Sequence, residues 1–229
     1  MGYHNDFLSL IYPLICPVCG RSLFKNEKTI CIKCHHHLPR TRFCGDPKNP
    51  AARVFWGRVP VHRTIVAFHY NKGNAVQQLI HDFKYKGHRG VGIFLGEELG
   101  KEIASIESLQ NISLIIPVPL HPKKQKKRGF NQSEIICQGI TKRIPAELDT
   151  SILTRRSFSS TQTRKSKYER WQNVESIFRL NKTDKISNKH ILLVDDVITT
   201  GATIEACIQS MLATEGIKIS VAAIAYTRG

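Results

Sequence analysis

The sequence has no long uninterrupted run of apolar residues, so it does not predict a membrane-spanning helix. The first twenty residues, "MGYHNDFLSLIYPLICPVCG", are briefly apolar but lack a basic lead and a small-residue cleavage site. We therefore do not expect a secretory signal peptide, and the default location is the cytoplasm. Internal repeats and low-complexity tracts are also missing. Hydrophobic residues make up 41% of the chain, enough to bury a core, so bulk disorder is not expected.

Acidic residues are scarce relative to basic ones. The 229 residues include 18 Asp and Glu against 34 Lys and Arg, a formal net charge of +16. Such a balance raises the local concentration of anions, either nucleic acid or small polyphosphates, although a generally solvated basic surface is the simpler alternative. Aromatic residues are only 8% of the chain, so a platform for stacking nucleic-acid bases is not evident.

The cysteine count is odd, and the chain shows no secretory signal, which together argue against a disulfide scaffold. Four of the seven cysteines form two Cys-x-x-Cys pairs, "CPVC" with Cys16 and Cys19 and "CIKC" with Cys31 and Cys34. Two such turns facing each other supply four thiolates, the tetrahedral set that zinc prefers. The sequence therefore predicts a structural zinc site in a small module over residues 1–45, with Gly20 in the first turn at positive φ and a small hairpin between the pairs.

Alternatives to this zinc set remain open at this stage. The two pairs could be redox-active or unrelated buried cysteines, although a redox pair is expected near a βαβ pattern that is not present here. The run from His35 to His37, or Cys44, could replace one ligand, although the histidines are more simply a solvated run. A closed four-thiolate site leaves no position for chemistry, so this module is expected to be a fold element or a docking surface.

The rest of the chain alternates strand-like and helix-like segments. Residues 45–62 are rich in Gly and Pro and are interpreted as a boundary region before a main domain over residues 60–229. Continuous apolar strands are predicted around residues 64–70, 112–120, 190–196 and 217–227, with helices between them. The glycines Gly87, Gly90 and Gly92 are expected to divide residues 74–106 into two helices. This order indicates an α/β fold with a mostly parallel sheet, whose ligands bind at the carboxyl ends of the strands.

The stretch "ILLVDDVITTGAT" places two adjacent carboxylates, Asp195 and Asp196, at the end of such a strand. Backbone N–H groups of residues 199–203, at the start of the following helix, can point at an anion, and Gly201 permits a close approach. The loop lacks the Gly-Lys-[Ser/Thr] ending of a Walker A loop. A ribose 5-phosphate fits both features, with its phosphate on the loop and its 2,3-diol on the carboxylates. A βα turn with capping threonines is the alternative.

These residues resemble the phosphoribosyl pyrophosphate (PRPP) motif of type I phosphoribosyltransferases. Three further features narrow the resemblance: "PVPLHPKKQKKRGFNQ", "TQTRKSKYERWQNV" and the four-cysteine module look like those of the ComF family, competence-associated proteins with a zinc finger ahead of a phosphoribosyltransferase domain. The resemblance covers nearly the whole chain. It implies the type I phosphoribosyltransferase fold, an enzyme acting on PRPP with magnesium, and a role in DNA uptake.

The resemblance also implies roles for particular residues. Residues 117–121 would form a pyrophosphate loop, and residues 161–173 a mobile flap that closes over the site. The residues implied in catalysis are Asp195, Asp196 and Arg170. The residues implied in binding PRPP are Pro117, Val118, Pro119, Arg128, Asn131, Gln132, Gln162, Asn173, Val197, Ile198, Thr199, Thr200, Gly201, Ala202 and Thr203.

Two basic segments have more than one interpretation. The flap carries Arg164, Lys165 and Lys167, which would be drawn to a departing pyrophosphate or would simply form a solvated loop. The run Lys123, Lys124, Lys126, Lys127 and Arg128 has the same ambiguity, with nucleic-acid phosphates as a further candidate. The second functional hypothesis is therefore a non-catalytic accessory factor that processes single-stranded DNA, alongside a competence helicase or other DNA-uptake proteins, and uses PRPP only as a ligand. No segment identifies the acceptor of a phosphoribosyl group.

Overall fold

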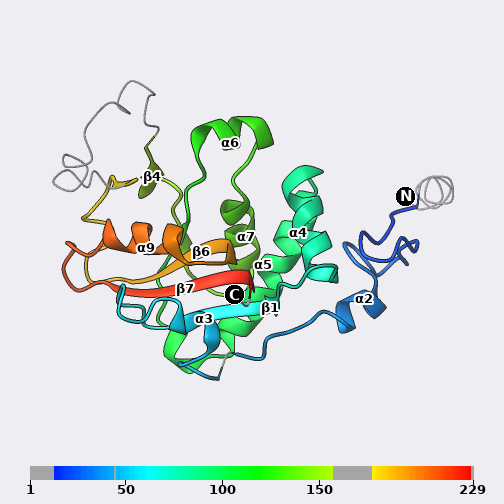
Figure 1. Ribbon diagram of the computed structural model, residues 1–229, viewed down its shortest axis with the longest axis horizontal. Coiled ribbons are helices and arrows are strands. Elements are labelled where there is room, and N and C mark those ends of the chain that lie inside the picture. The colour runs from blue at the N-terminus through cyan, green and yellow to red at the C-terminus, as the bar shows by residue number, and fades with distance from the viewer. Residues whose placement is uncertain (1–12, 44, 157–176, 228–229) are drawn as a thin grey trace.

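The computed structural model describes residues 13–43, 45–156 and 177–227. Its centre is a five-stranded, fully parallel sheet in the order β1-β7-β6-β2-β3 (Figure 1). The strands are β1 (Thr64–His69), β2 (Leu114–Pro117), β3 (Glu147–Leu148), β6 (His190–Ile198) and β7 (Lys218–Tyr226). A separate antiparallel pair consists of β4 (Leu153–Arg155) and β5 (Phe178–Leu180). The predicted α/β class with a parallel sheet is confirmed.

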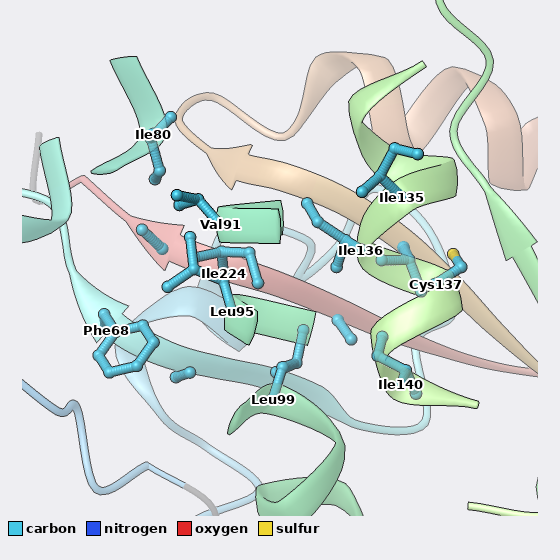
Figure 2. Packing of buried hydrophobic residues seen from close by; sticks show 14 of the residues in the cluster. Phe68, Ile80, Val91, Leu95, Leu99, Ile135, Ile136, Cys137, Ile140 and Ile224 are labelled. Carbon is cyan, nitrogen blue, oxygen red and sulfur yellow. The ribbon is translucent and has the colours of Figure 1, made fainter. Parts of the chain in front are cut away.

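Helices cover both faces of the sheet, as its continuous apolar strands require. Along β6, Leu192 and Val194 pack in one core cluster, while Ile191 and Leu193 pack in another. The first cluster lies against α4 (Ala75–Tyr85), α5 (Arg89–Ala104) and α7 (Gln132–Ile140), and the second against α3 (Pro50–Arg53) and α9 (Ala202–Gln209). Figure 2 shows the first cluster, in which side chains of α5 and α7 meet Phe68 and Ile224 of the sheet.

Glycines allow α5 and α7 to approach closely. A Cβ atom built on Gly96 would lie 2.2 Å from the backbone oxygen of Ile136, and one on Gly139 would lie 2.3 Å from that of Ile93. Of the three expected helix breakers, only Gly87 lies between α4 and α5, at φ +71°. The predicted division into two helices is therefore confirmed. Gly90 and Gly92 were wrongly expected to contribute to it, since they lie inside α5, where packing of the helix outweighs the weak helix propensity of glycine.

The segment interpreted as a boundary, residues 45–62, packs against the sheet. It contains α3, and the side chains of Ala51 and Phe55 are buried in the second core cluster. Asn49 caps α3 through Ala52 N–H and also donates to the backbone oxygen of Thr64 in β1. The composition of this segment indicated a boundary, but Ala51 and Phe55 anchor it in the core of the main domain.

The remaining short helices are α2 (Ile32–His36), the 3-10 helix η1 (Glu107–Leu109) and α6 (Pro122–Arg128). The module before residue 45 lies beside α4 in Figure 1, away from α9. Within the described part of the chain, every helix is too short or too polar to cross a membrane.

Candidate functional site

The acidic pair lies within β6, at the carboxyl edge of the sheet. The strand continues two residues beyond the pair, because Val197 and Ile198 still pair with Ala225 and Tyr226 of β7. The carboxylates therefore lie on a strand rather than in the turn after it. Ile198 is buried in the core, and Val197 packs partly against it, so these two implied PRPP-binding residues can offer a ligand mainly their backbone.

Asp195 is half-buried and has only partial compensation for its charge. Its Oδ1 accepts hydrogen bonds from the backbone N–H of Asp196, at 2.8 Å, and from the hydroxyl of Ser133, at 3.2 Å. Burial raises the pKa of Asp195 to about 7, and repulsion by Asp196 acts in the same direction. The hydrogen bonds and the charge of Lys84 oppose that rise without cancelling it.

Lys84 is a site residue that the sequence analysis missed. It lies in the last turn of α4, and its Nζ is 2.7 Å from Oδ2 of Asp196. Both side chains are largely buried, with 21% and 17% of their surfaces exposed, so the pair is less screened than one in open solvent. The sequence offers no local signal for this contact, because 112 positions separate the two residues in the chain.

The loop after β6 leads into α9, whose N-cap residue, Gly201, has no side chain to cap the helix. The N–H of Ala202 makes a long hydrogen bond of 3.5 Å to the hydroxyl of Thr200. Thr199 and Thr200 are exposed, and Gly201 precedes α9 at φ +71°. A Cβ atom on Gly201 would lie 2.6 Å from Val54 and 2.8 Å from Phe55, so glycine is required both by conformation and by space. A helix start that is capped only by this long hydrogen bond, and whose backbone can be approached closely, is suited to bind an anion.

Arg58 stabilises this loop through hydrogen bonds to its backbone. Its Nη1 donates to the backbone oxygens of Thr200, at 2.8 Å, and Val54, at 3.0 Å, and its guanidinium pairs with Glu205 in the first turn of α9. Arg58 comes from the segment interpreted as a boundary, and no motif in the sequence connects it with the site.

The residues implied in a pyrophosphate loop lie beside the acidic pair, after β2. The N–H of Val118 donates to the backbone oxygen of Val194, and Asn131 donates to the backbone oxygen of Val118 while capping α7. A cavity of about 220 Å³ here is lined by Pro117, Pro119 and Arg155, among others. The Nε of Arg155 is buried and has no hydrogen-bond partner within the described ranges, which suits a site for an anionic group.

Arg128 lies at the end of α6 and connects two parts of the site. Its guanidinium is 5.4 Å from the ring centre of Tyr85 in α4, and its Nη1 donates to Gln132 in α7. The implied residues Gln162, Arg170 and Asn173, together with Arg164, Lys165 and Lys167, lie outside the described residues. The chain enters and leaves that stretch through the paired strands β4 and β5.

The four predicted metal ligands come together. The sulfur atoms of Cys16, Cys19, Cys31 and Cys34 all lie within 4.8 Å of one another, and those of Cys19 and Cys31 are 3.7 Å apart. A tetrahedral zinc with bonds of about 2.3 Å requires sulfur atoms about 3.8 Å apart, so this donor set fits zinc. Gly20 has φ +73°, as predicted for the first turn. The bridge between Ile15 and Ser22 encloses the first cysteine pair, so it is not the hairpin that was predicted between the two pairs.

The histidine run does not join that cluster. The Nε2 of His35 is 2.9 Å from the buried carboxylate of Glu98, and the Nδ1 of His37 is 2.7 Å from the backbone oxygen of Lys33. Glu98 also pairs with Arg40 and Lys101, so His35 helps to dock the module on α5 rather than being solvated. Cys44, the other alternative ligand, lies outside the described residues.

Comparison with known proteins identifies the class of the main domain. A family profile described as "Phosphoribosyl transferase domain" matches residues 133–229, which include the acidic pair and the loop after it. The parallel sheet, the carboxylates at its edge and this match define a type I phosphoribosyltransferase fold.

The relatives are named for DNA utilization and competence. DNA utilization protein YhgH of Escherichia coli (strain K12) is 30% identical over 206 residues, covering 86% of this chain and 84% of that protein. Competence protein F of Haemophilus influenzae is 28% identical over 146 residues, covering 62% and 63%. Competence protein ComFC of Bacillus subtilis is 23% identical over 227 residues, covering 88% and 90%. The chain belongs to the ComF family, which confirms the resemblance found in its sequence.

Proposed function

We propose that this protein binds PRPP and transfers its phosphoribosyl group to an acceptor. The 5-phosphate would bind the N–H groups of residues 199–203, and the 2,3-diol would donate to Asp195 and Asp196. The observation that carries the proposal is the direct succession of a partly uncompensated carboxylate pair and a helix start that only one long side-chain hydrogen bond caps. A ligand with hydroxyl donors next to a phosphate matches both features.

The same arrangement supports a substitution at C1 of the ribose. As the bond from C1 to the diphosphate breaks, positive charge develops on the sugar ring, and Asp195 and Asp196 would stabilise it. The diphosphate would lie near residues 117–121, within reach of Arg155 and of the implied residues Arg128 and Asn131. Magnesium, when bound with PRPP, supplies charge neutralisation of the leaving diphosphate.

The first test is calorimetry with PRPP and magnesium. The double variant Asp195→Asn, Asp196→Asn should lose PRPP binding by at least tenfold while keeping its fold, because the diol loses its charged acceptors. Glu107→Gln, an exposed carboxylate in η1, is the control and should bind like the parent. A folded double variant with parental affinity would show that PRPP does not bind at this site.

We also propose that the four-cysteine cluster holds one structural zinc ion. Protein purified without added zinc should contain one zinc per chain, and Cys31→Ser should lower that content, because it removes one of four thiolates. Cys207→Ala changes a buried cysteine of the core outside the cluster. It is the control, and the zinc content of this variant should equal that of the parent. Parent protein without zinc, or Cys31→Ser with full zinc, would contradict the assignment.

A second function, single-stranded DNA processing, is favoured by one observation. Lys123, Lys124, Lys126 and Lys127 lie on α6, a helix with no buried residue, and none of them forms an ion pair with another described residue. Four such cations on one exposed helix suit a chain of phosphates. A competence helicase or other DNA-uptake proteins would then be partners in the cytoplasm, and PRPP would be a ligand of the same protein.

A further inference from the structure

A cavity of about 270 Å³ lies at the start of β1, where the segment that contains α3 packs against this strand (Figure 1). β1 is an edge strand, and β7 separates it from β6, which carries the acidic pair. The volume suits a molecule slightly smaller than the ligands that fill sites of about 300–1,000 Å³. The lining includes Ala52, Phe55, Trp56, Val59, Arg63 and Thr64.

Two polar atoms of the lining are buried without a partner. Thr64 is 3% exposed, and within the described ranges neither its Oγ1 nor the Nη1 of Arg63 has a hydrogen-bond partner. Most buried polar groups in proteins are paired, so two adjacent exceptions at one cavity indicate a missing ligand. A guanidinium can only donate hydrogen bonds, and a hydroxyl can also donate one, so the ligand must supply acceptors.

The charge around the cavity favours an anion as that acceptor. Burial lowers the pKa of His62, and the nearby positive charges of Lys218 and Arg63 act in the same direction. Among the described residues that line the cavity there is no Asp or Glu to balance Arg63. A cleft lined by charge of one sign concentrates ligands of the opposite sign.

The remaining walls are apolar or aromatic. Ala52, Phe55 and Val59 are buried, and the ring of Trp56, which is 55% exposed, forms part of the lining. Apolar walls with a few polar groups are typical of sites for small organic molecules. Such walls favour an oxyanion attached to an apolar or aromatic body over a hydrated inorganic ion, whose water they would displace.

Phe55 connects the cavity with the loop after β6. It lines the cavity, and a Cβ atom on Gly201 would lie 2.8 Å from its ring. Three residues further on, Arg58 donates to the backbone oxygen of Thr200. A ligand stabilises the conformation to which it binds, so a molecule in the cavity would oppose displacement of this segment and of the loop that it contacts.

We propose that this cavity is an effector site for a small organic oxyanion, a carboxylate or a phosphate carried on an apolar or aromatic body. The oxyanion accepts hydrogen bonds from Arg63 and Thr64, and the body contacts Phe55 and Trp56. Occupancy holds the loop after β6 in the form that binds the 5-phosphate, so the effector and PRPP each raise the affinity for the other. This coupling rests on the proposed function, whereas the anion site does not.

The probes are benzoate and phenyl phosphate, which carry the two kinds of oxyanion on the same ring, and benzamide, a neutral molecule with the shape of benzoate. Equilibrium dialysis in a buffer free of carboxylate and phosphate measures their binding to the full chain. The parent should bind at least one of the anions, and benzamide at least tenfold more weakly. Arg63→Met should weaken anion binding about tenfold or more and Thr64→Val about threefold or more, because each removes a donor to a charged group. Arg179→Met, at an exposed arginine of β5, is the matched control and should bind like the parent.

Thermal denaturation separates a role in binding from a role in folding. Because Nη1 of Arg63 and Oγ1 of Thr64 have no partner among the described residues, Arg63→Met and Thr64→Val should not lower the Tm of the unliganded protein. Both variants should lose the rise in Tm that a saturating anion gives the parent. A lowered Tm combined with parental anion binding would assign the two side chains to folding and overturn the proposal.

The remaining outcomes are equally distinct. Binding of benzoate alone identifies a carboxylate as the ligand, and binding of phenyl phosphate alone identifies a phosphate. A parent that binds neither anion, or that binds benzamide as tightly, overturns the proposal, as do Arg63→Met and Thr64→Val variants with parental affinity.

PRPP calorimetry with and without the saturating anion tests the coupling. The affinity of the parent for PRPP should rise about fivefold or more, and an unchanged or lowered affinity overturns the effector role. A parent that binds the anion through Arg63 and Thr64 but binds no PRPP overturns the proposed function and the coupling together, and confirms the anion site.

Discussion

The negative charge of Asp195, which would bind the ligand, lowers the stability of the unliganded protein. Burial, with repulsion by Asp196, raises its pKa from 3.8 to about 7, so the folded protein binds a proton that the unfolded chain has released. Stability contributed by this group is therefore present below about pH 4 and is lost as the pH rises to about 7. Functional sites often retain such unfavourable charges because their ligands compensate for them.

Asp195→Asn should consequently stabilise the unliganded protein at pH 8 and have little effect through this carboxylate near pH 4. Thermal denaturation across that range would measure it. Asp149→Asn is the control of opposite sign, because hydrogen bonds from Ser151 and Lys185 outweigh burial and lower the pKa of Asp149. Its removal should destabilise the protein at pH 8, with the difference disappearing in acid. If Asp195→Asn had the same dependence of stability on pH as the parent, the charge of this carboxylate would not destabilise the folded protein.

Residues of the site were predictable from the sequence only where a local motif contains them. The acidic pair, Gly201 and the four cysteines stand in short patterns whose spacing reflects one turn or one strand end. Lys84 and Arg58 have no such pattern, since each reaches the site from a distant segment through a single long side chain. Contacts of that kind depend on tertiary packing, which periodicity and composition do not encode.

At the scale of elements, four of the five strands of the parallel sheet were predictable. The strand β3, the pair β4 and β5, and the role of the glycines of α5 were not. Continuous apolar runs indicated buried parallel strands, and the sheet confirms them. Gly90 and Gly92 were expected to interrupt a helix, because glycine has weak helix propensity. What the sequence could not reveal is that α7 lies across α5, where Gly92 and Gly96 leave space for Ile135 and Ile136.

We therefore expect substitution by alanine to have opposite effects on stability at two glycines of α5. Gly96→Ala should destabilise the protein by about 1–3 kcal/mol, because its Cβ would lie 2.2 Å from the backbone oxygen of Ile136. Gly90→Ala meets no atom within 4 Å and should be neutral or stabilising by up to about 1 kcal/mol. Urea denaturation of both variants would measure the difference, and equal effects would show that close helix packing does not select Gly96.

At the scale of the whole molecule, the cysteine module and the main domain are joined through buried charge. Glu98 of α5 is 2% exposed. Its carboxylate pairs with His35 and Arg40 of the module and with Lys101 of its own helix. Gln78 of α4 adds a hydrogen bond to Pro17. The module is thus held against α4 and α5, and α4 is also the helix that supplies Lys84 to the site.

The net charge of +16 suits two kinds of ligand, DNA on the one hand and the phosphates of PRPP alone on the other. The lysines of α6, which form no ion pair with another described residue, directly follow the implied pyrophosphate loop, so both ligands can use nearby cations. The two uses differ in their salt dependence. Single-stranded DNA releases counterions along its length, and the logarithm of its affinity falls with a slope of about 0.7 for each phosphate contact.

We predict weak binding of single-stranded DNA whose affinity falls steeply with salt, and a slope reduced by up to about 3 when Lys123, Lys124, Lys126 and Lys127 are all changed to Ala. PRPP binding should suffer less, since Asp195, Asp196 and the loop after them remain. Lys189→Ala with Lys218→Ala, at the amino ends of β6 and β7, is the control and should keep the parental slope. Titrations at several salt concentrations, with and without PRPP, would decide. A slope unaffected by the four substitutions would exclude α6 as the DNA contact, and the excess of positive charge would then be better explained by small polyphosphate ligands.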